Sequence, residues 1–377
     1  MQRIDHLLLA QSLGSHKTLS SFHFGQNGAG PKVYIQASLH AEELPGMLVA
    51  HHLRALLEAA HAAGQIKGEI ILVPVANPIG LAQRLDHKPM GRFELDTSEN
   101  FNRYYPDFAK AIAPALLDAL GDDAQTNITL VRRAMGEYLR NWLPATELQS
   151  LRRTLLTLSH DADWVLDLHC DCEGVMHLYT EEACWPQLQA LAHFLGSETI
   201  LLAKSSGSWP FDECLSGLWW QLAQRLQESG RKVALPQGCC STTIELRGEA
   251  DVSHAWAQAD AKAIYAWLQH TQIVVDTARA PAVPPAKCQP TPLAGAQTLR
   301  APAPGIVVFA AQVGATLQVG DLVAEIIDPI ANQSHRVLAG VGGTFFGRIR
   351  DRYITAGGEL GKIAGATPFR TGELLGA

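Results

Sequence analysis

The chain has 377 residues and a mass of 40.8 kDa, which at about 150 residues per domain predicts two or three domains. Hydrophobic residues make up 47% of the sequence and charged residues 18%, a balance typical of globular proteins and not of disordered or collagen-like chains. The formal net charge of −7 provides no basic surface for a polyanion, so we expect no nucleic-acid partner.

The first part of the chain alternates short apolar runs with helical spacing. We expect strands at residues 32–36 and 69–75, with a helix that follows Pro45 and continues to Leu57. A strand–helix–strand crossover of this kind is typical of an α/β sheet.

The middle of the chain continues this alternation. The expected elements are helical spacing over residues 108–158, a strand at 164–169, a helix at 215–226, a strand at 242–246 and a helix at 255–268. Together they predict one large α/β domain over residues 1–277.

A run of proline and alanine at residues 278–285 interrupts the pattern. Because proline cannot continue a helix or a sheet ladder, we expect residues 278–289 to form a semi-rigid linker. Residues 290–377 then have the spacing of short strands with glycine turns. This segment repeats itself at an offset of 38 residues, which pairs Gly305 with Gly343, Gly320 with Gly358, and Leu322 with Leu360. Two equivalent β units predict a small pseudo-twofold barrel or sandwich.

The sequence contains no segment typical of membrane insertion or export. Apolar runs such as residues 305–311 are much shorter than the roughly 20 residues of a membrane span, and the apolar stretch at residues 7–10 is too short for a signal-peptide core. The 7 cysteines follow no disulfide framework. We therefore expect a cytoplasmic protein with reduced thiols.

His40 and Glu43 follow the first expected strand and are three residues apart. Residues at this spacing share one face of a helical turn, so the pair can supply two ligands to a zinc ion. In a chain with 15 histidines such a pair also occurs by chance, and a surface histidine near a helix start is the alternative interpretation.

His169 ends the strand expected at residues 164–169, at the sheet edge where α/β folds place their sites. Asp167 lies on the same strand face and is either a partner of His169 or an ordinary strand-end acid. A thiolate site at Cys170 and Cys172 is a weaker alternative, because no second cysteine pair with metal-ligand spacing accompanies them.

Two further motifs place charges in unusual positions. Glu245 lies inside an apolar, β-branched strand, where an unpaired carboxylate is costly and has either an ion-pair partner or a function. Asn102 and Arg103, preceded by Arg92, combine an amide with guanidinium groups. That combination suits the capture of a substrate carboxylate, and a structural salt bridge is the alternative.

The order of these motifs is far more specific than any one of them. His40-x-x-Glu43 precedes Asn77-Pro78-Ile79-Gly80, Asn102-Arg103, Asp167-Leu168-His169 and Ile244-Glu245-Leu246-Arg247. Over about residues 30–270 the chain resembles the succinylglutamate desuccinylase/aspartoacylase family of the zinc carboxypeptidase superfamily. The helical region at about residues 108–160 is the least matched.

The resemblance implies a three-layer α/β/α catalytic domain with a mixed central sheet, one Zn²⁺ per chain and a set of site residues. The implied metal ligands are His40, Glu43 and His169, with Glu245 as the general base. Asn102 and Arg103 are implied to hold a substrate carboxylate. Arg92 is implied to polarise the scissile carbonyl, and Arg84 is the alternative.

The sequence departs from the family pattern in places. Asn100-Phe101 stands where the family usually has Asp-Leu, and no substrate-capping tyrosine can be matched, so Tyr104, Tyr105 and Tyr179 are candidates. The loop at residues 206–213 is a further candidate lining of the pocket.

The C-terminal domain resembles biotinyl and lipoyl carrier domains. No lysine lies between Cys288 and Gly361, and Lys362 follows the second Gly-Glu-Leu turn instead of lying at the tip between the repeats. We therefore expect no covalently attached cofactor, and interpret this domain as a lid or an oligomer contact.

The function implied by the resemblance is zinc-dependent hydrolysis of the amide bond of a small N-acyl amino acid. The alternatives are a metallocarboxypeptidase acting on peptide C-termini and a catalytically silent binding protein on the same fold. Neither nucleic acid nor membrane is an expected partner, and a homo-oligomer is compatible with the sequence.

Overall fold

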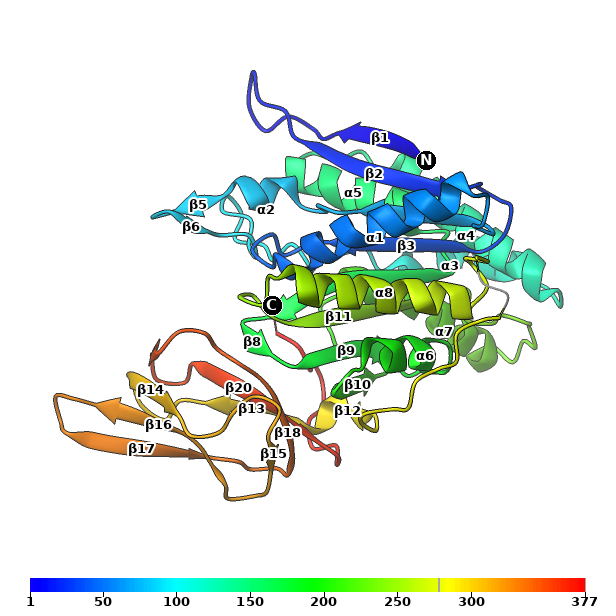
Figure 1. Ribbon diagram of the computed structural model, residues 1–377. Helices are drawn as coiled ribbons and strands as arrows, with labels where there is room; N and C mark the ends of the chain where they lie inside the picture. The colour runs from blue at the N-terminus through cyan, green and yellow to red at the C-terminus, as the bar shows by residue number, and fades with distance from the viewer. Residues whose placement is uncertain (277–278, 377) are drawn as a thin grey trace.

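The computed structural model describes residues 1–276 and 279–376. A large α/β domain makes up most of the molecule, and a smaller all-β unit, residues 296–365, lies beside β9 and β10 (Figure 1). We call this smaller unit the β domain.

The larger domain is built on a mixed sheet of nine strands. Its centre, β4–β3–β7–β11, is parallel, and β2 and β9 join the two sides of this centre in antiparallel orientation. In spatial order the strands are β1 (Gln2–Leu7), β2 (Thr18–Gly25), β4 (Glu69–Val73), β3 (Lys32–Ala37), β7 (Trp164–Asp171), β11 (Cys240–Gly248), β9 (Met176–Glu181), β10 (Thr199–Ala203) and β12 (Thr291–Pro292).

Helices cover both faces of this sheet, which confirms the three-layer α/β/α arrangement (Figure 1). The layer nearer the viewer in Figure 1 contains α1 (Pro45–Ala62), α6 (Trp185–Leu195) and α8 (His254–His270). The other layer contains α3 (Phe108–Leu116), α4 (Ala124–Asn141), α5 (Glu147–Ser159) and α7 (Phe211–Glu228). A short helix, α2 (Pro78–Ala82), follows β4.

The central strands are apolar on both faces because each face meets a helical layer. Side chains alternate along a strand, so Val33 and Ile35 of β3 pack toward α1 and α8, whereas Tyr34 packs toward α7. Buried strands of this kind hold the polar residues at their carboxyl ends in fixed positions.

The elements expected from apolar spacing are confirmed, with ends that differ by a few residues. The helix expected at 255–268 is α8, and the helical stretch at 108–158 divides into α3, α4 and α5. The sequence analysis did not predict β1, β2, β9, β10 or α6.

The β domain confirms the predicted internal repeat. Gly305 begins β14 and its match Gly343 begins β18. The short strand of each repeat pairs with the other repeat, since β15 pairs with β18 and β19 pairs with β14. One sheet contains β13 (Ala296–Arg300), β20 (Glu359–Gly365), β18 (Gly343–Arg348) and β15 (Thr316–Leu317), and the other contains β17 (Gln333–Leu338), β16 (Leu322–Asp328), β14 (Gly305–Phe309) and β19 (Tyr353–Ile354).

The two domains are joined by strand pairing as well as by the chain. β8 (Glu173–Gly174), directly after β7, pairs with β18 of the β domain. Of the predicted linker, residue 278 lies outside the described residues, and residues 279–289 contain no helix or strand. The domain limits at residues 277 and 290 stay a prediction.

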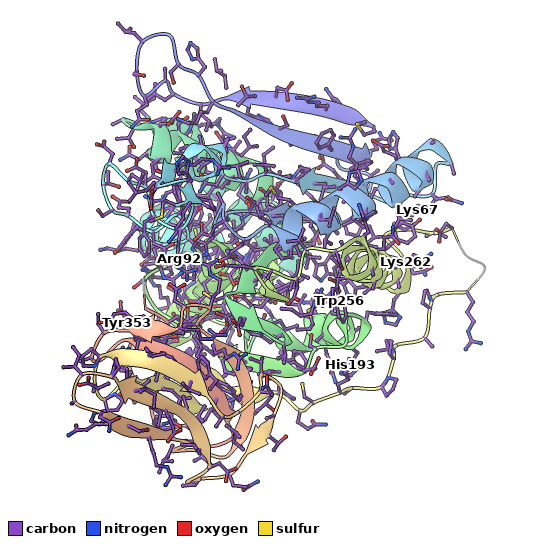
Figure 2. The ribbon with its side chains drawn as sticks, turned by 60° about the vertical axis from the view of Figure 1, so that its left-hand side comes forward. Lys67, Arg92, His193, Trp256, Lys262 and Tyr353 are labelled. Atoms are coloured by element: carbon purple, nitrogen blue, oxygen red, sulfur yellow. The ribbon has the colours of Figure 1, made fainter. Side chains whose placement is uncertain are left out.

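The buried Trp267 on α8 supports the packing of α8 on the sheet. Its ring is fully buried and lies 6.0 Å from that of Trp164 on β7. We expect Trp267→Ala to lower the free energy of unfolding by about 3–5 kcal/mol. Trp256→Ala is the matched control on the same helix (Trp256 is labelled in Figure 2), because Trp256 is 50% exposed and its replacement is expected to cost about 1 kcal/mol or less. Urea unfolding measures both values, and equal losses would contradict this packing.

Candidate metal and substrate site

A pocket of about 260 Å³ opens at the carboxyl ends of β3, β7 and β11 and extends to the β domain. Phe346 and Lys362 line it from the β domain. Every residue predicted for the site except Arg84 lines this pocket, namely His40, Glu43, Arg92, Asn102, Arg103, His169 and Glu245. Arg84 lies on the exposed hairpin of β5 (Arg84–Leu85) and β6 (Lys88–Pro89) and is not part of the described lining.

The turn between β3 and α1 brings His40 and Glu43 to one side. The backbone N–H of Glu43 donates to the carbonyl of His40 at 3.1 Å, which closes a single turn before α1 begins at Pro45. Gly46 allows the helix to approach the sheet, because a Cβ there would lie 3.1 Å from the Cβ atoms of Ala37 and Leu168.

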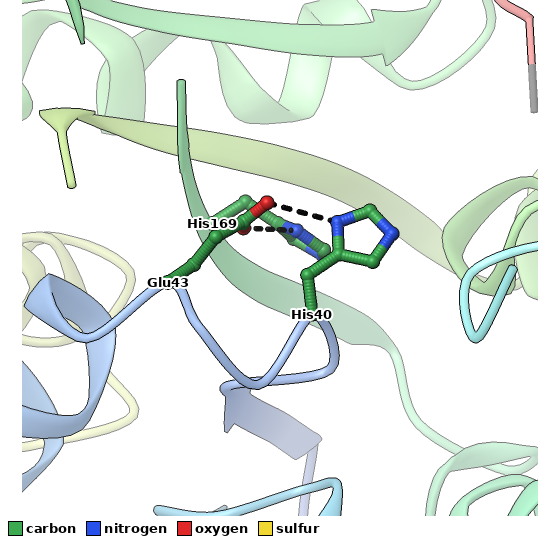
Figure 3. A group of neighbouring side chains, drawn as sticks. All are labelled: His40, Glu43 and His169. Atoms are coloured by element: carbon green, nitrogen blue, oxygen red, sulfur yellow. Dashed lines mark hydrogen bonds and ion pairs between the residues drawn. The ribbon is translucent and has the colours of Figure 1, made fainter. Parts of the chain in front are cut away.

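His40, Glu43 and His169 form the centre of the pocket (Figure 3). Nδ1 of His40 lies 2.9 Å from one carboxylate oxygen of Glu43, and Nδ1 of His169 lies 2.8 Å from the other. All three side chains are buried, and their candidate ligand atoms lie within 4.8 Å of one another. The structure therefore brings together the three ligands implied by the sequence.

The far side of each imidazole faces an oxygen acceptor. Nε2 of His40 lies 2.9 Å from Oδ1 of Asn100, and Nε2 of His169 lies 3.0 Å from Oδ2 of Asp167. Nε2 of His169 and Oδ2 of Asp167 are within ion-pair distance but are not aligned as a hydrogen bond. At His40 the Asn100 oxygen favours the tautomer with hydrogen on Nε2, which leaves the Nδ1 lone pair directed toward Glu43. This is the arrangement that metal-ligating histidines need.

The donor set suits a divalent metal ion. Two imidazole nitrogens and a carboxylate are the ligands of many catalytic metal sites that keep a further coordination position open. Burial and the nearby Arg92 guanidinium lower the pKa of His40 to about 4, so that its ring is neutral near pH 7, the form that binds a metal. Burial alone would lower the pKa of His169, but the carboxylates of Asp167 and Glu43 raise it well above its ordinary value.

Glu245 lies beside this group on the neighbouring strand. In the parallel register of β7 and β11 it is directly opposite His169, and its Oε2 has no hydrogen-bond partner among the described residues. Burial, together with the carboxylates of Glu43 and Asp171, raises the pKa of Glu245 to about 8. The side chain is a buried carboxyl group with high proton affinity, and no arginine of residues 1–276 or 279–376 forms an ion pair with it, so the described structure does not show the ion-pair alternative for Glu245.

Arg92 and Arg103 approach the site from different directions. Nη1 of Arg92 lies 3.2 Å from Oε1 of Glu43, and the side chain, which lines the pocket, is 45% exposed. Arg103 is buried, and among the described residues its guanidinium donates hydrogen bonds to the backbone carbonyls of Asn102 and Gly376. No carboxylate lies within ion-pair distance of Arg103 in the part of the chain that is described. A buried cation held only by carbonyl oxygens is suited to bind an anion.

Asn102 serves the fold and the pocket together. Its Oδ1 accepts a hydrogen bond from the N–H of Phe211 at 2.8 Å, at the start of α7. The amide nitrogen remains as the donor of this pocket-lining side chain.

The three candidate tyrosines have different surroundings. Tyr179 lines the pocket, Tyr104 is 56% exposed and Tyr105 is buried in the core beside Phe211. Ser206 and Pro210 of the predicted 206–213 loop also line the pocket, but the loop is shorter than predicted because α7 begins at Phe211.

Among the pocket residues that the sequence analysis gave no role in the site are Asp171 and Lys362. Asp171 continues β7 beyond His169, and Lys362 enters from β20 with its Nζ 3.6 Å from Oδ1 of Asp171. The alternation of β7, which places residues 167, 169 and 171 on one face, is a signal that would have found Asp171.

Glu213 and its neighbour Asp212 are acids at the start of α7 that also line the pocket. Both carboxylate oxygens of Glu213 accept from the N–H of Ser206, at 2.8 and 3.0 Å. Burial and the Asp212 carboxylate raise the pKa of Glu213 to about 7.

Residues 29–271 match the succinylglutamate desuccinylase/aspartoacylase catalytic domain. The match covers more than half of the chain, so the protein belongs to the succinylglutamate desuccinylase/aspartoacylase family, a hydrolase family that acts on small molecules. No curated protein matches the chain.

Solved structures of similar proteins agree with this assignment. A succinylglutamate desuccinylase/aspartoacylase family protein from Shewanella amazonensis is 27% identical, with a TM-score of 0.82 over 97% of this chain and 98% of that one. A second from Shewanella frigidimarina is 26% identical, with a TM-score of 0.82 over 97% of both chains. The ectoine utilization protein EutE (DoeB) from Ruegeria pomeroyi shares the fold at 16% identity, with a TM-score of 0.65 over 97% of this chain and 95% of that one.

The helices and the cysteines bear on the expected absence of a membrane span and on the expected reduced thiols. None of the helices in residues 1–276 and 279–376 is both long and apolar enough to span a bilayer. The seven cysteines, all of which lie in the described residues, are free thiols. A cytoplasmic location stays a prediction.

Asn100 is expected to set the metal affinity through His40. We expect Asn100→Ala to weaken metal binding by about 10–100-fold, because loss of the acceptor frees the imidazole to rotate and change tautomer. Asn100→Asp is the matched control, since it keeps an oxygen at the same position. Chelator competition measures both affinities. An alanine variant with wild-type affinity would show that the Asn100 contact does not orient His40.

Glu213 is expected to make stability depend on pH. Its folded-state pKa of about 7 lies above the ordinary value of 4.5, so its contribution is complete below pH 4.5 and is lost as pH rises through 7. Glu213→Gln removes this dependence. As the pH rises from 5 to 8, the free energy of unfolding of the wild type is therefore expected to fall relative to that of Glu213→Gln, by at most about 3 kcal/mol. Urea unfolding at both pH values measures the shift, and Glu228→Gln at the exposed end of α7 is the control that should keep the wild-type slope.

Proposed function

We propose that the protein is a zinc-dependent amidohydrolase that releases the amine from a small N-acyl amino acid. The observation that carries the proposal is the convergence, in one pocket, of the His40–Glu43–His169 group, the unpartnered carboxylate Glu245 and the buried guanidinium of Arg103. Membership of a deacylase family supports the same conclusion.

His40, Glu43 and His169 would hold the zinc ion, which their donor chemistry fits. When bound, the ion supplies Lewis-acid chemistry that acidifies water and polarises a carbonyl. Asn100 would keep the His40 imidazole in the tautomer that binds it, and the Asp167 carboxylate lies 3.0 Å from the far nitrogen of His169.

Glu245 is the proposed general base. Its raised proton affinity suits a group that takes a proton from water during attack on the amide carbonyl and then gives it to the departing amine. Its position opposite His169 in the same pocket supports this role, because the proposed metal ligands lie beside it.

The arginines would provide charge for binding and for the transition state. Arg103 and the amide nitrogen of Asn102 would hold the carboxylate of the amino acid. Arg92, whose Nη1 is 3.2 Å from Glu43, would stabilise the negative charge that develops on the carbonyl oxygen. Arg84 lies outside the described pocket lining, which favours Arg92 over Arg84 for this role.

The wall contributed by the β domain favours a small substrate. Phe346, Lys362 and Arg300 close one side of the pocket, which leaves less room for a peptide than an open cleft does. This favours a deacylase over a metallocarboxypeptidase. The intact set of ligands, base and arginine likewise argues against a silent binding protein.

Glu245→Gln is the decisive variant for this function. We expect one zinc ion per chain in the wild type and in the variant. Turnover is expected to fall at least about 100-fold in the variant, because the side-chain amide of glutamine cannot accept the proton from water. Metal analysis measures the zinc, and amine release is assayed with N-acetylaspartate, N-succinylglutamate, N-acetyl-diaminobutyrate and one peptide with a free C-terminus.

The outcomes separate the alternatives. Release from an N-acyl amino acid supports the deacylase, and release from the peptide alone supports the carboxypeptidase. Full turnover by Glu245→Gln would contradict its role as the base. Stoichiometric zinc in His40→Ala would contradict the ligand set, and absence of both zinc and turnover in the wild type would favour the binding protein.

A further inference from the structure

The last described residues leave the β domain and return to the larger domain. After β20 the chain, red in Figure 1, ends within the outline of the larger domain. Residues 373–376, which we call the strap, line the pocket through Leu374, Leu375 and Gly376. The strap contains no helix or strand.

A few contacts hold the strap against the loop at residues 206–209. The N–H groups of Leu374 and Leu375 both donate to the carbonyl of Ser206, at 2.8 and 3.2 Å. The hydroxyl of Ser208 donates to Oε1 of Glu373 at 2.8 Å, at the protein surface. Leu374 is buried against apolar residues such as Phe346.

The end of the strap contacts the guanidinium of Arg103, the group that binds the substrate carboxylate in the proposed function. Nη2 of Arg103 donates to the carbonyl of Gly376 at 2.6 Å, and Nη1 donates to the carbonyl of Asn102 at 2.7 Å. Nε of Arg103 has no hydrogen-bond partner among the described residues. The Gly376 oxygen thus uses a donor that two-point binding of a carboxylate needs.

We propose that the strap is an autoinhibitory contact, in which the Gly376 carbonyl competes with the substrate carboxylate for Arg103 and must be displaced for binding. This proposal rests on the proposed function, because it requires Arg103 to bind a carboxylate of the substrate. It assigns regulation of that site to a segment of the chain itself.

The chemistry of the two oxygens favours displacement. A carboxylate forms charge-assisted hydrogen bonds with a guanidinium that are roughly twice as strong as those of a neutral carbonyl. The substrate therefore gains more from Arg103 than the strap does.

The strap is also the more mobile partner. Arg103 is held in place, because the next two residues, Tyr104 and Tyr105, donate backbone hydrogen bonds of 3.1 Å to Ser208 and Trp209. Besides the contacts described above, the strap accepts one hydrogen bond, from Nη2 of Arg370 to the carbonyl of Leu374 at 2.6 Å. It contains no helix or strand and its Glu373 is exposed, as expected for a segment of low local stability.

With competition of this kind, the apparent affinity for substrate is the intrinsic affinity multiplied by the fraction of molecules whose strap is open. Weakening the strap should therefore lower KM and leave kcat unchanged. Deletion of the Glu373–Ser208 hydrogen bond is the mildest way to do so, since Glu373 is exposed and is neither a pocket-lining residue nor a member of the core.

Glu373→Ala tests the strap, with Glu373→Gln as the matched control that keeps an acceptor for Ser208. We expect the alanine variant to lower KM by about twofold to tenfold, the range that loss of one hydrogen bond gives. The glutamine variant should retain the wild-type KM, and kcat should be the same in all three proteins. An unchanged or higher KM in Glu373→Ala would overturn the proposal.

Hydrogen exchange of Leu374 and Leu375 provides a test that does not require turnover. We add to Glu245→Gln the intact N-acyl amino acid that the wild type hydrolyses. Exchange at these amides is then expected to accelerate, because displacement of the strap breaks their hydrogen bonds to Ser206. Slower exchange would show a strap that closes over the substrate and would overturn the proposal.

Failure of the proposed function is distinguishable from failure of the strap proposal. If the wild type hydrolyses no N-acyl amino acid, the function fails, and the strap is judged on exchange in the wild type with L-glutamate as the carboxylate probe. Acceleration at Leu374 and Leu375 then supports displacement by a carboxylate, and unchanged or slower exchange overturns it.

Discussion

The buried carboxylate of Glu43 is the contact on which the site depends. Its two oxygens face imidazoles from different parts of the chain, His40 in the turn after β3 and His169 on β7, and one oxygen also accepts the N–H of Cys170 at 3.2 Å. Burial of an acid without partners is costly, and these contacts remove that cost. The partners meet only because β3 and β7 pair in parallel. The parallel centre of the sheet therefore assembles the site, and the outer strands and helices keep that centre buried.

Much of this arrangement was predictable from local patterns. The crossover formed by β3, α1 and β4 has apolar runs of the correct length, and the polar residues that interrupt such runs or end them, Glu245 and His169, are the ones that reach the pocket. Asn100 shows a limit of this reasoning. It was noted only as a departure from the family pattern, whereas the structure places its side-chain oxygen on His40.

Other features depend on contacts that no local pattern encodes. β1 is the exposed edge strand, and polar residues interrupt the apolar positions of both β1 and β2, so their apolar signal is weak. Lys362 and the strap reach the pocket from about 190 to 270 residues away from His169 and Arg103 in sequence, and only the docking of the β domain brings them there. Arg84 shows the converse, because a residue type that suited the chemistry lies on an exposed hairpin.

The pairing of β8 with β18 limits how the molecule can move. A backbone ladder connects the two domains one step beyond β7, and Glu173 reinforces it through ion pairs of 2.6 Å with both Arg348 and Arg352. Rigid-body swinging of the β domain away from the larger domain would break this ladder and these pairs together. Opening the pocket by such a hinge is therefore costly. Small molecules are expected to enter and leave through movements of short segments at the edge of the pocket. In this architecture the β domain stays in place as one side of the pocket, and access depends on the short segments beside it.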